Sequence, residues 1–309
     1  MPVQFETDQI KEIVRLALNE DIGSGDITSR IFVPERSETE GTFVAKESGI
    51  LAGLPVAEYV LSQIDKEVTF TPNIEDGVKI EKGTKIAKIE GSTISILTAE
   101  RLVLNFLQRL SGIATMTNSF VERVKGYSTR IMDTRKTTPG LRHLERYAVQ
   151  VGGGHNHRMG LYDQILVKDN HLKIIEADTL DRQNRDVPRG KSVSKIHRLV
   201  QRARELTKNE VLIEVEIEDI GIIKTVLEAG VDIVMLDNMS PSEMVKAIKI
   251  IKEHDAVEKK TIMKQTLIEA SGNISLDNIE AYAKTGVDRI SVGRITHSAN
   301  ALDISLDFS

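Results

Sequence analysis

The sequence predicts an α/β protein in which a parallel sheet follows an N-terminal region of antiparallel strands. After about residue 127, strand-like apolar runs alternate with amphipathic helical runs, a pattern typical of parallel pairing through right-handed crossovers. Earlier in the chain, short apolar runs broken by glycine indicate antiparallel hairpins. A barrel and an open doubly wound sheet both fit the later region. Polar residues near the ends of its strands favour the barrel, where strand ends converge on one mouth, and these residues are Lys168, Glu216, Asp237, Ser271 and Gly293.

Composition narrows the class of protein. No apolar run reaches the roughly 18 residues of a membrane span, and the first residues lack the basic and apolar segments of a secretory signal. The absence of cysteine excludes disulfides and thiolate metal sites and fits a cytoplasmic location. A net charge of −5 gives no reason to expect a nucleic-acid binder, so any anion site must be local.

Two helices are expected in the N-terminal region. The first runs from Thr7 to about Asn19 and ends at the turn-rich stretch EDIGSGDITS, residues 20–29. The second begins near Thr98 and extends through residue 124, with an expected interruption near Gly112. Between these helices, residues 41–55 and 68–92 read as hairpins of an antiparallel sheet, with turns at Asp76-Gly77 and Lys82-Gly83.

The later region contains six strand-like runs. Amphipathic stretches at 194–208 and 240–254 lie between some of them and predict covering helices. The strands are expected within residues 129–136, 163–170, 211–218, 231–238, 266–272 and 289–294.

Cations concentrate in one part of this acidic chain. Between Arg135 and His171 lie six Lys or Arg residues, three Asp or Glu residues and four of the seven histidines. His155 and His157 resemble a metal pair at first sight, but no cysteine completes a zinc site, and hydrogen bonding to a substrate or a strand end is the favoured interpretation. The glycines at 152–154 do not match the dinucleotide-binding fingerprint, which disfavours a nicotinamide cofactor.

Three carboxylates mark two strand ends. Alternation places Glu214 and Glu216 on one face of their strand, and Asp237 ends an otherwise apolar strand. Carboxylates at strand ends suit Mg²⁺ held partly by substrate phosphates and water. The alternative is that one or both glutamates pair with neighbouring Lys or Arg residues.

Two other features can be interpreted either as binding sites or as ordinary structural elements. The small-residue turns EASGNIS, residues 269–275, and SVGRITHS, residues 291–298, can hold a phosphate through backbone N–H groups, or they are only turns. Arg101 is expected in the first turn of its helix, on a polar face with Asn105 and Gln108. That face is either solvated or reaches the anion site of another subunit.

Several motifs together resemble one family. They run nearly end to end and include LNEDIGSGDIT, TAERLVLNFLQRLSGIAT, DTRKTTPGLR, GGGHNHRMGLYDQILVKDNH, EVE, LDN, EASGNIS and VGRITHS. In these motifs the chain resembles the quinolinate phosphoribosyltransferases, also called nicotinate-nucleotide pyrophosphorylases (carboxylating). A related group of the same fold, associated with molybdenum transport, shares the DTRKT-like and HR-G-L-like segments, but KDNH and EVE favour quinolinate as the substrate.

The resemblance implies an N-terminal open-faced α/β sandwich joined to an incomplete parallel α/β barrel. The implied domains cover residues 1–112, joined by the tail from about 295 to 309, and residues 113–294. The implied enzyme is a pentosyltransferase of de novo NAD biosynthesis that converts quinolinate and phosphoribosyl pyrophosphate, with Mg²⁺, into nicotinate mononucleotide, pyrophosphate and CO₂. It also implies a homodimer, or a higher assembly of dimers, with active sites shared between subunits.

The resemblance further implies a role for each matching position. Arg135, His157, Arg158 and Lys168 match residues around the quinolinate carboxylates, and Arg101 matches an arginine donated by the partner subunit. Lys136 matches the lysine near the phosphoribosyl group. Glu216 and Asp237 match the acids at the ribose and the metal, and with Lys136 they are the implied catalytic residues. The positions that match the 5′-phosphate loops are Ser271, Gly272, Gly293 and His297.

Two stretches depart from the matched pattern. Residues 177–195 are long and polar for a connection in this fold, and the stretch EHDAVEKKTIMKQTLIEASG, residues 253–272, adds residues before its strand. A polyanion-binding protein is the rival from another class, and a content of only 4% aromatic residues counts against it because stacking platforms are scarce.

Overall fold

The computed structural model describes residues 8–177, 195–258 and 265–308. The chain divides into two compact units. The first unit comprises Met1–Glu122, Lys136–Asn156 and Gly293–Ser309, and the second comprises Arg123–Arg135 and His157–Val292. Among the described helices, none is both long enough and apolar enough to cross a membrane.

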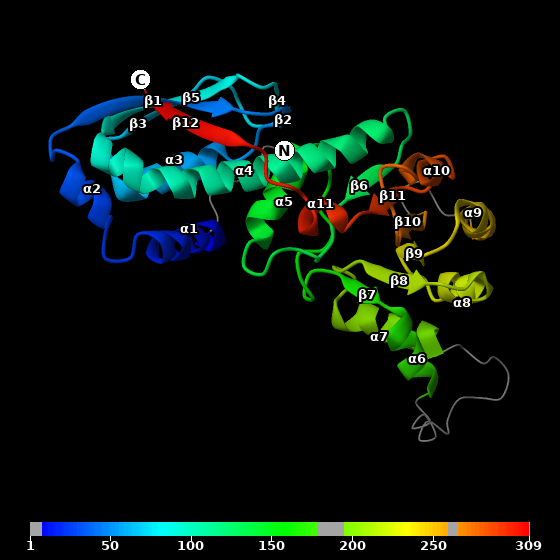
Figure 1. Cartoon of the computed structure of the whole chain (residues 1–309). Helices are drawn as coiled ribbons and strands as arrows, with labels where there is room; N and C mark the ends of the chain where they lie inside the picture. Colours follow the sequence, from blue (N-terminus) through cyan, green and yellow to red (C-terminus); the bar gives the residue numbers. More distant parts are fainter. Residues whose placement is uncertain (1–7, 178–194, 259–264, 309) are drawn as a thin grey trace. The chain divides into compact units, whose positions relative to one another are not determined.

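The first unit is built on a four-stranded antiparallel sheet (Figure 1). Its order is β12-β1-β5-β3, from Ile304–Phe308, Glu38–Ala45, Lys85–Ser92 and Thr69–Pro72. The C-terminal strand β12 pairs with β1 in the register Phe43↔Leu306, so the last and the first strand of the chain are neighbours in one sheet. The helices of this unit are α1 (Asp8–Asp21), α2 (Ile27–Phe32), α3 (Leu54–Ile64), α4 (Thr93–Arg123), α5 (Arg142–Val151) and α11 (Arg294–His297).

The prediction of antiparallel strands was right, but neither predicted turn joins two strands that pair with each other, since β3 pairs with β5. The turns at Gly77 and Gly83 have positive φ angles of 88° and 91°, which glycine adopts without strain. The short strand β4 (Lys79–Ile80) pairs with β2 (Gly49–Ile50) and not with β5, although the turn at Gly83 joins β4 to β5. Helix α3 was missed, because its first residues belong to an apolar run that read as a strand.

Helix α4 corrects two predictions. It begins at Thr93 instead of Thr98, and it continues unbroken through Gly112. A Cβ atom at Gly112 would collide with the backbone carbonyl of Asn300, so this glycine permits a close approach of the C-terminal segment and does not interrupt the helix. Arg101 therefore lies in the third turn of α4, outside the first turn where the helix dipole acts on a cation.

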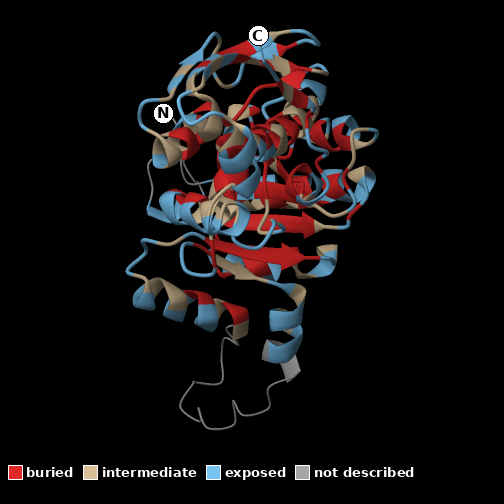
Figure 2. Cartoon of the chain, turned by 60° about the vertical axis from the view of Figure 1, so that its left-hand side comes forward, coloured by how far each residue is buried: buried red, intermediate tan, exposed pale blue. Residues whose placement is uncertain are grey.

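The second unit contains a six-stranded parallel sheet in the order β6-β11-β10-β9-β8-β7. The strands are β6 (Arg130–Met132), β7 (Ile165–Val167), β8 (Ile213–Ile217), β9 (Ile233–Asp237), β10 (Leu267–Ser271) and β11 (Arg289–Ser291). Within the described residues the edge strands β6 and β7 do not pair with each other, which agrees with the predicted incomplete barrel. Buried residues, red in Figure 2, gather on the strands, and exposed residues, pale blue, lie on the helices and the loops.

Helices connect the parallel strands and cover them. They are α6 (Asp169–Ala177), α7 (Lys195–Leu206), η2 (Ile220–Ile222), α8 (Ile223–Glu228), α9 (Pro241–Val257) and α10 (Ile279–Ala283). Helices α7 and α9 confirm the two amphipathic predictions, and α9 starts with a capping box formed by Ser240 and Glu243. The polar stretch at 178–194 and residues 259–264 lie outside the described residues.

Strand register decides which side chains share the inner face of this sheet. Glu216 of β8 pairs with Met235 of β9, which pairs with Glu269 of β10, which pairs with Arg289 of β11. Because side chains alternate along a strand, Glu214 lies on the same face as Glu216. All five residues of β8 are buried, so both glutamates face the protein interior.

Candidate active site

The carboxyl ends of the parallel strands bring together most of the predicted site residues of the second unit. Lys168 directly follows β7, Glu216 is the penultimate residue of β8, and Asp237 is the last residue of β9. Ser271 ends β10 and pairs with Asp237, and Gly272 follows it. Since all six strands run in one direction, these side chains line one edge of the sheet.

A lysine and two acids meet at this edge. The Lys168 Nζ lies 3.4 Å from Oε2 of Glu216. Burial raises the pKa of Glu216, the charge of Lys168 opposes that rise, and the charge of Asp237 adds to it. The sheet edge thus holds two carboxylates that repel each other. Carboxylate oxygens are the ligands that Mg²⁺ prefers.

Two guanidinium groups lie near each other in the same unit. Burial lowers the pKa of Arg158, and the charge of Arg135 lowers it further. The Arg158 Nη1 donates to the backbone carbonyl of Gln164 at 3.2 Å, which fixes the side chain. Two neighbouring arginines repel each other in the free protein, so an anion between them relieves the repulsion.

The ends of β9 and β10 are cross-linked in a way that requires glycine. The Asn238 N–H donates to the Ser271 carbonyl at 3.0 Å, and Asn273 Nδ2 donates to Asn238 Oδ1 at 3.1 Å. Gly272 has a φ of 91°, and a Cβ atom there would collide with the Asn238 side chain. Asn238 and Asn273 also adopt positive φ angles, of 55° and 50°. The turn after β10 therefore has a fixed backbone, as a loop that binds a phosphate through N–H groups needs.

His157 lies in the interior of the second unit, between two glutamates. Its Nε2 is 3.1 Å from Glu214 Oε2 and 3.3 Å from Glu269 Oε1, and both carboxylates are fully buried. The backbone N–H of His157 donates to Asp133 Oδ1 at 2.7 Å. Burial alone would lower the pKa of His157, but the hydrogen bonds and charges of the two glutamates outweigh it and raise the pKa to about 9.

An arginine completes this buried cluster, which we define as His157, Glu214, Glu269 and Arg289. The Arg289 Nε lies 2.8 Å from Glu269 Oε2, and Gln164 Nε2 donates to Glu214 Oε2 at 2.5 Å. Burial and the charge of Glu269 also raise the pKa of Glu214. The Arg158 N–H approaches His157 Nδ1 at 2.8 Å, the geometry of a neutral ring protonated at Nε2. The extra proton therefore belongs to the cluster as a whole, shared between the ring and the carboxylates.

In the structure the two glutamates of β8 have different partners, and the buried cluster contains residues that the sequence interpretation missed. Glu214 contacts a histidine and a glutamine, whereas Glu216 pairs with a lysine. Glu269 and Arg289 were not singled out, although strand alternation places Glu269 on the same face as Ser271. The three potential metal ligands His157, Glu214 and Glu269 lie within 4.8 Å of one another, but Arg289 already supplies a cation to them.

Four predicted site residues belong to the first unit: Arg101, Lys136, Gly293 and His297. The Lys136 carbonyl accepts a hydrogen bond from Thr296 Oγ1 at 2.8 Å, so Lys136 lies beside the turn that carries Gly293 and His297. Lys136 and His297 are exposed, and so is Arg101 on α4. Gln108, expected on the same polar face as Arg101, instead donates to the Ile304 carbonyl at 2.8 Å.

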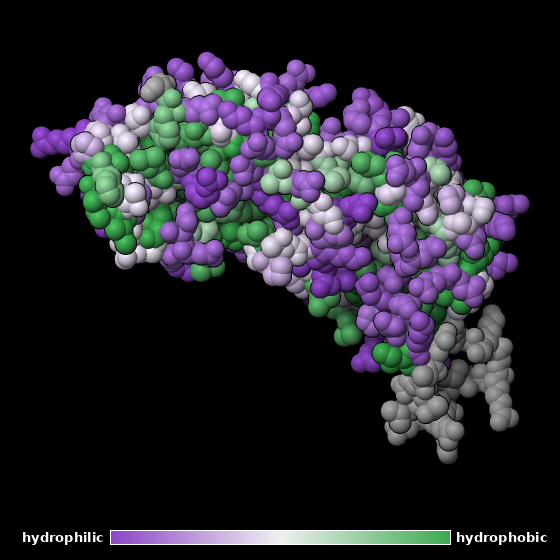
Figure 3. Space-filling view, viewed as in Figure 1, coloured by the Kyte–Doolittle hydropathy of each residue, from purple (hydrophilic) through white to green (hydrophobic). Residues whose placement is uncertain are grey.

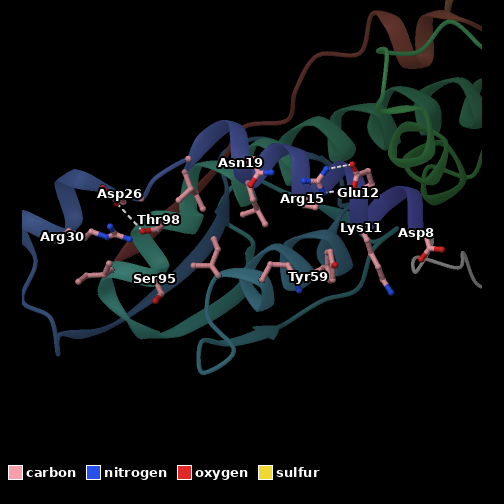
Figure 4. Close-up of a pocket in the computed structure, with 17 residues that line it drawn as sticks. Asp8, Lys11, Glu12, Arg15, Asn19, Asp26, Arg30, Tyr59, Ser95 and Thr98 are labelled. Carbon is pink, nitrogen blue, oxygen red and sulfur yellow. Dashed lines mark hydrogen bonds and ion pairs between the residues drawn. The ribbon is translucent and has the colours of Figure 1, made fainter.

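A pocket of about 640 Å³ also lies in the first unit, between α1, α2, α3 and the start of α4 (Figure 4). It contains none of the predicted site residues. Several of its charged groups are engaged with one another: Arg15 pairs with Glu12 at 2.6 Å, and Asp26 caps α2. The strand ends of the second unit therefore remain the candidate site.

Comparison with known proteins identifies the family. Residues 26–111 and 113–307 match the N-terminal and C-terminal domains of quinolinate phosphoribosyl transferase. The chain is 39% identical to a probable nicotinate-nucleotide pyrophosphorylase (carboxylating) of Bacillus subtilis, over 97% of this chain and 93% of that protein. It is 38% identical to quinolinate phosphoribosyltransferase (decarboxylating) 1b of Nicotiana tabacum, over 99% of this chain and 84% of that protein.

Solved structures agree with the sequence matches. The nicotinate-nucleotide pyrophosphorylase of Francisella tularensis has a TM-score of 0.84 and 37% identity, with 99% of this chain and 98% of that chain covered. NadC from Streptococcus pyogenes has the same TM-score and identity, with 98% and 99% covered. The motifs, the incomplete barrel and the full-length matches lead to one conclusion: the chain belongs to the quinolinate phosphoribosyltransferase family.

Proposed function

We propose that this protein transfers a phosphoribosyl group from phosphoribosyl pyrophosphate to quinolinate, with decarboxylation, to give nicotinate mononucleotide, pyrophosphate and CO₂ in de novo NAD biosynthesis. The observation that carries the proposal is the sheet edge of the second unit. A dicarboxylate suits the neighbouring guanidinium groups of Arg135 and Arg158 and the ammonium group of Lys168. The carboxylates of Glu216 and Asp237 lie along the same edge. Planar guanidinium groups bind carboxylates bidentately.

The first chemical step needs positive charge stabilised at the ribose. As pyrophosphate leaves, positive charge builds at C1, and the quinolinate nitrogen attacks that carbon. Glu216 and Asp237 are the anions placed to favour this oxocarbenium-like state electrostatically. Lys136 is the proposed cation beside the departing pyrophosphate. By the family resemblance, the residues proposed to bind the 5′-phosphate are Ser271, Gly272, Gly293 and His297.

The second step removes a carboxylate as CO₂. Quaternisation of the ring nitrogen places a positive charge next to the carbon that loses the carboxylate, and this charge stabilises the electron pair that the departing CO₂ leaves on that carbon. A proton then replaces the carboxylate at that carbon. Arg135 and Arg158 orient the two carboxylates, and His157 is proposed to contribute through its place next to Arg158.

Mg²⁺ is the proposed cofactor, and Glu216 and Asp237 would hold it, directly or through water. Both are hard oxygen donors at neighbouring strand ends, and their mutual repulsion supports a cation between them and the substrate phosphates. When bound, the ion would neutralise charge on the departing pyrophosphate.

A homodimer with shared active sites is also part of the proposal. Helix α2 exposes Ile27, Ile31 and Phe32 to 70, 68 and 80%, and hydrophobic atoms gather over this helix in Figure 3. Exposed apolar clusters mark interaction surfaces, and a second copy of the chain is the proposed partner. Arg101 is proposed to enter the partner's site. A cytoplasmic location, with which the lack of cysteine is compatible, completes the proposal.

The function is tested by incubating the purified protein with quinolinate, phosphoribosyl pyrophosphate and Mg²⁺ and measuring nicotinate mononucleotide and CO₂. We expect product that depends on all three components, with quinolinate preferred over nicotinate. No product from either pyridine acid would refute the proposed activity. Analytical ultracentrifugation of the wild-type chain and of Phe32→Asp tests the dimer, which the charged side chain is expected to dissociate.

A further inference from the structure

An ion pair in the interior of the first unit connects two helices. Arg109 of α4 and Glu145 of α5 approach at 2.7 Å, from Nη2 to Oε1. The Glu145 side chain is fully buried, and that of Arg109 is 28% exposed. A buried carboxylate is costly unless its oxygens are satisfied, so the remaining hydrogen bonds of this pair show what it organises.

Those hydrogen bonds lead to two loops that carry proposed site residues. The Arg109 Nη2 also donates to the Thr296 carbonyl at 2.8 Å and to Thr138 Oγ1 at 3.3 Å. The second oxygen of Glu145 accepts from the Thr138 N–H at 3.2 Å. Thr138 lies two residues after Lys136, and Thr296 lies directly before His297. One ion pair thus joins the loop after Lys136 to the turn from Gly293 to His297.

The side chain of Thr296 closes this network. Thr296 is fully buried, and its Oγ1 lies 2.8 Å from the Lys136 carbonyl and 3.0 Å from the Gly293 carbonyl. The side chain of Thr296 therefore connects the backbone of Lys136 to the 293–297 turn. Arg109 donates to the backbone carbonyl of Thr296 and so holds that residue as well.

We propose that Arg109, with Glu145, is a positioning residue that fixes Lys136 and the 293–297 turn relative to each other for binding of phosphoribosyl pyrophosphate. This inference rests on the proposed function, which gives Lys136 to the phosphoribosyl pyrophosphate and the turn to its 5′-phosphate. Arg109 acts through the two loops and does not touch the substrate. A misplacement of charged groups by about 1 Å is enough to weaken a positioned transition state about 100-fold.

The proposal predicts a selective kinetic defect. The cations assigned to quinolinate, Arg135 and Arg158, belong to the second unit, whereas all the hydrogen bonds described above lie within the first unit. Loss of the network should therefore raise KM for phosphoribosyl pyrophosphate roughly tenfold or more and lower kcat, with KM for quinolinate changed less than twofold. A purely structural role predicts a lower melting temperature with both KM values unchanged.

Two variants and a matched control test this prediction. Arg109→Lys keeps the charge but loses the guanidinium fork, and Thr296→Val keeps the shape but loses the tie to Lys136. The control is Arg204→Lys, because Arg204 Nη2 is likewise shared between a carboxylate, Asp232 at 2.8 Å, and a carbonyl, Gly230 at 3.0 Å. Arg204 contacts the amino-end side of β9, away from the site edge of its own sheet.

Steady-state kinetics in both substrates and thermal melting followed by circular dichroism are measured for each protein. Both test variants should show the selective rise in KM for phosphoribosyl pyrophosphate, and Arg204→Lys should show only a lower melting temperature. Equal changes in the two KM values, or none, in a folded Arg109→Lys protein that retains turnover would overturn the positioning role and leave the proposed function standing. Absence of turnover in the wild-type protein would overturn both.

Discussion

The buried cluster of His157, Glu214, Glu269 and Arg289 makes the stability of the protein depend on pH in a defined direction. The pKa of His157 is raised from 6.5 to about 9, and that of Glu214 is also raised. Both shifts mean that the folded protein binds a proton more tightly than the unfolded chain does. The resulting stability is fully present below about pH 6.5 and is lost as the pH rises through about 9. The sign is the same whether the proton resides on the ring or on a carboxylate.

The magnitude follows from the shift. A rise from 6.5 to about 9, at about 1.4 kcal/mol for each pH unit, contributes about 3 kcal/mol to the free energy of unfolding. Glu214 and Glu269 lie at similar distances from the ring, 3.1 and 3.3 Å, and together they outweigh the burial that alone would lower the pKa of His157. In Glu214→Gln the burial of the ring remains and one of the two carboxylate charges is gone, so the loss of stability between pH 6.5 and 9.5 should shrink to less than half of the wild-type loss.

Urea unfolding measures this difference, followed by circular dichroism because the chain contains no tryptophan. The wild-type protein, Glu214→Gln and the control Glu253→Gln are compared at several pH values. Glu253 is an exposed residue whose nearest cationic partner, Lys249, is 3.9 Å away, so its variant should follow the wild-type curve. Histidine C–H resonances in NMR spectra, assigned with His157→Asn, report the titration directly. Identical slopes for wild-type and Glu214→Gln proteins would refute the reasoning.

Three further predictions concern individual residues. Arg158→Ala should raise KM for quinolinate roughly 10- to 100-fold while KM for phosphoribosyl pyrophosphate changes little, because a charge-assisted hydrogen bond contributes about 1.5–3 kcal/mol; equal losses for both substrates would argue against its assigned role. Inactive Arg101→Ala protein mixed with inactive Glu216→Gln protein should regain activity if sites are shared between subunits, and failure despite confirmed subunit exchange would favour a self-contained site. The Tyr147 hydroxyl donates a hydrogen bond to Asp76, which is half-buried in the turn before β4, so Tyr147→Phe should lower the free energy of unfolding by about 1–2 kcal/mol. Tyr162→Phe, at an exposed position, should leave it unchanged, and equal melting curves for the two variants would contradict this.

The sheet edge could be predicted from the sequence because it depends on local patterns. Alternation within a strand assigns each side chain to a face, and parallel strands bring their carboxyl ends to one edge. Those two rules were enough to connect Lys168, Glu216 and Asp237. The motif resemblance then added Arg135 and Arg158, whose proximity neither rule predicts.

Other features could not be predicted because they depend on what a residue meets across the fold. Gly112 reads as a helix breaker, yet the helix continues and the glycine accommodates the carbonyl of Asn300, which is 188 positions later in the chain. A charged residue inside a strand, such as Glu269 or Arg289, is normally assigned to the solvent side. Only the register of β10 against β11 shows that these two face each other inside the sheet.

The buried cluster and the cationic edge of the second unit follow one electrostatic logic. Two buried carboxylates, one arginine and one shared proton leave the cluster nearly neutral, although the charge of Glu214 still raises the pKa of Arg158. The charge of Arg135 lowers the pKa of Arg158, and an incoming dicarboxylate would relieve this repulsion. Without Arg289, the two glutamates would carry an uncompensated negative charge beneath the edge and would weaken anion binding. The interior charges of the barrel are therefore expected to influence anion binding at the proposed site, although they do not face it.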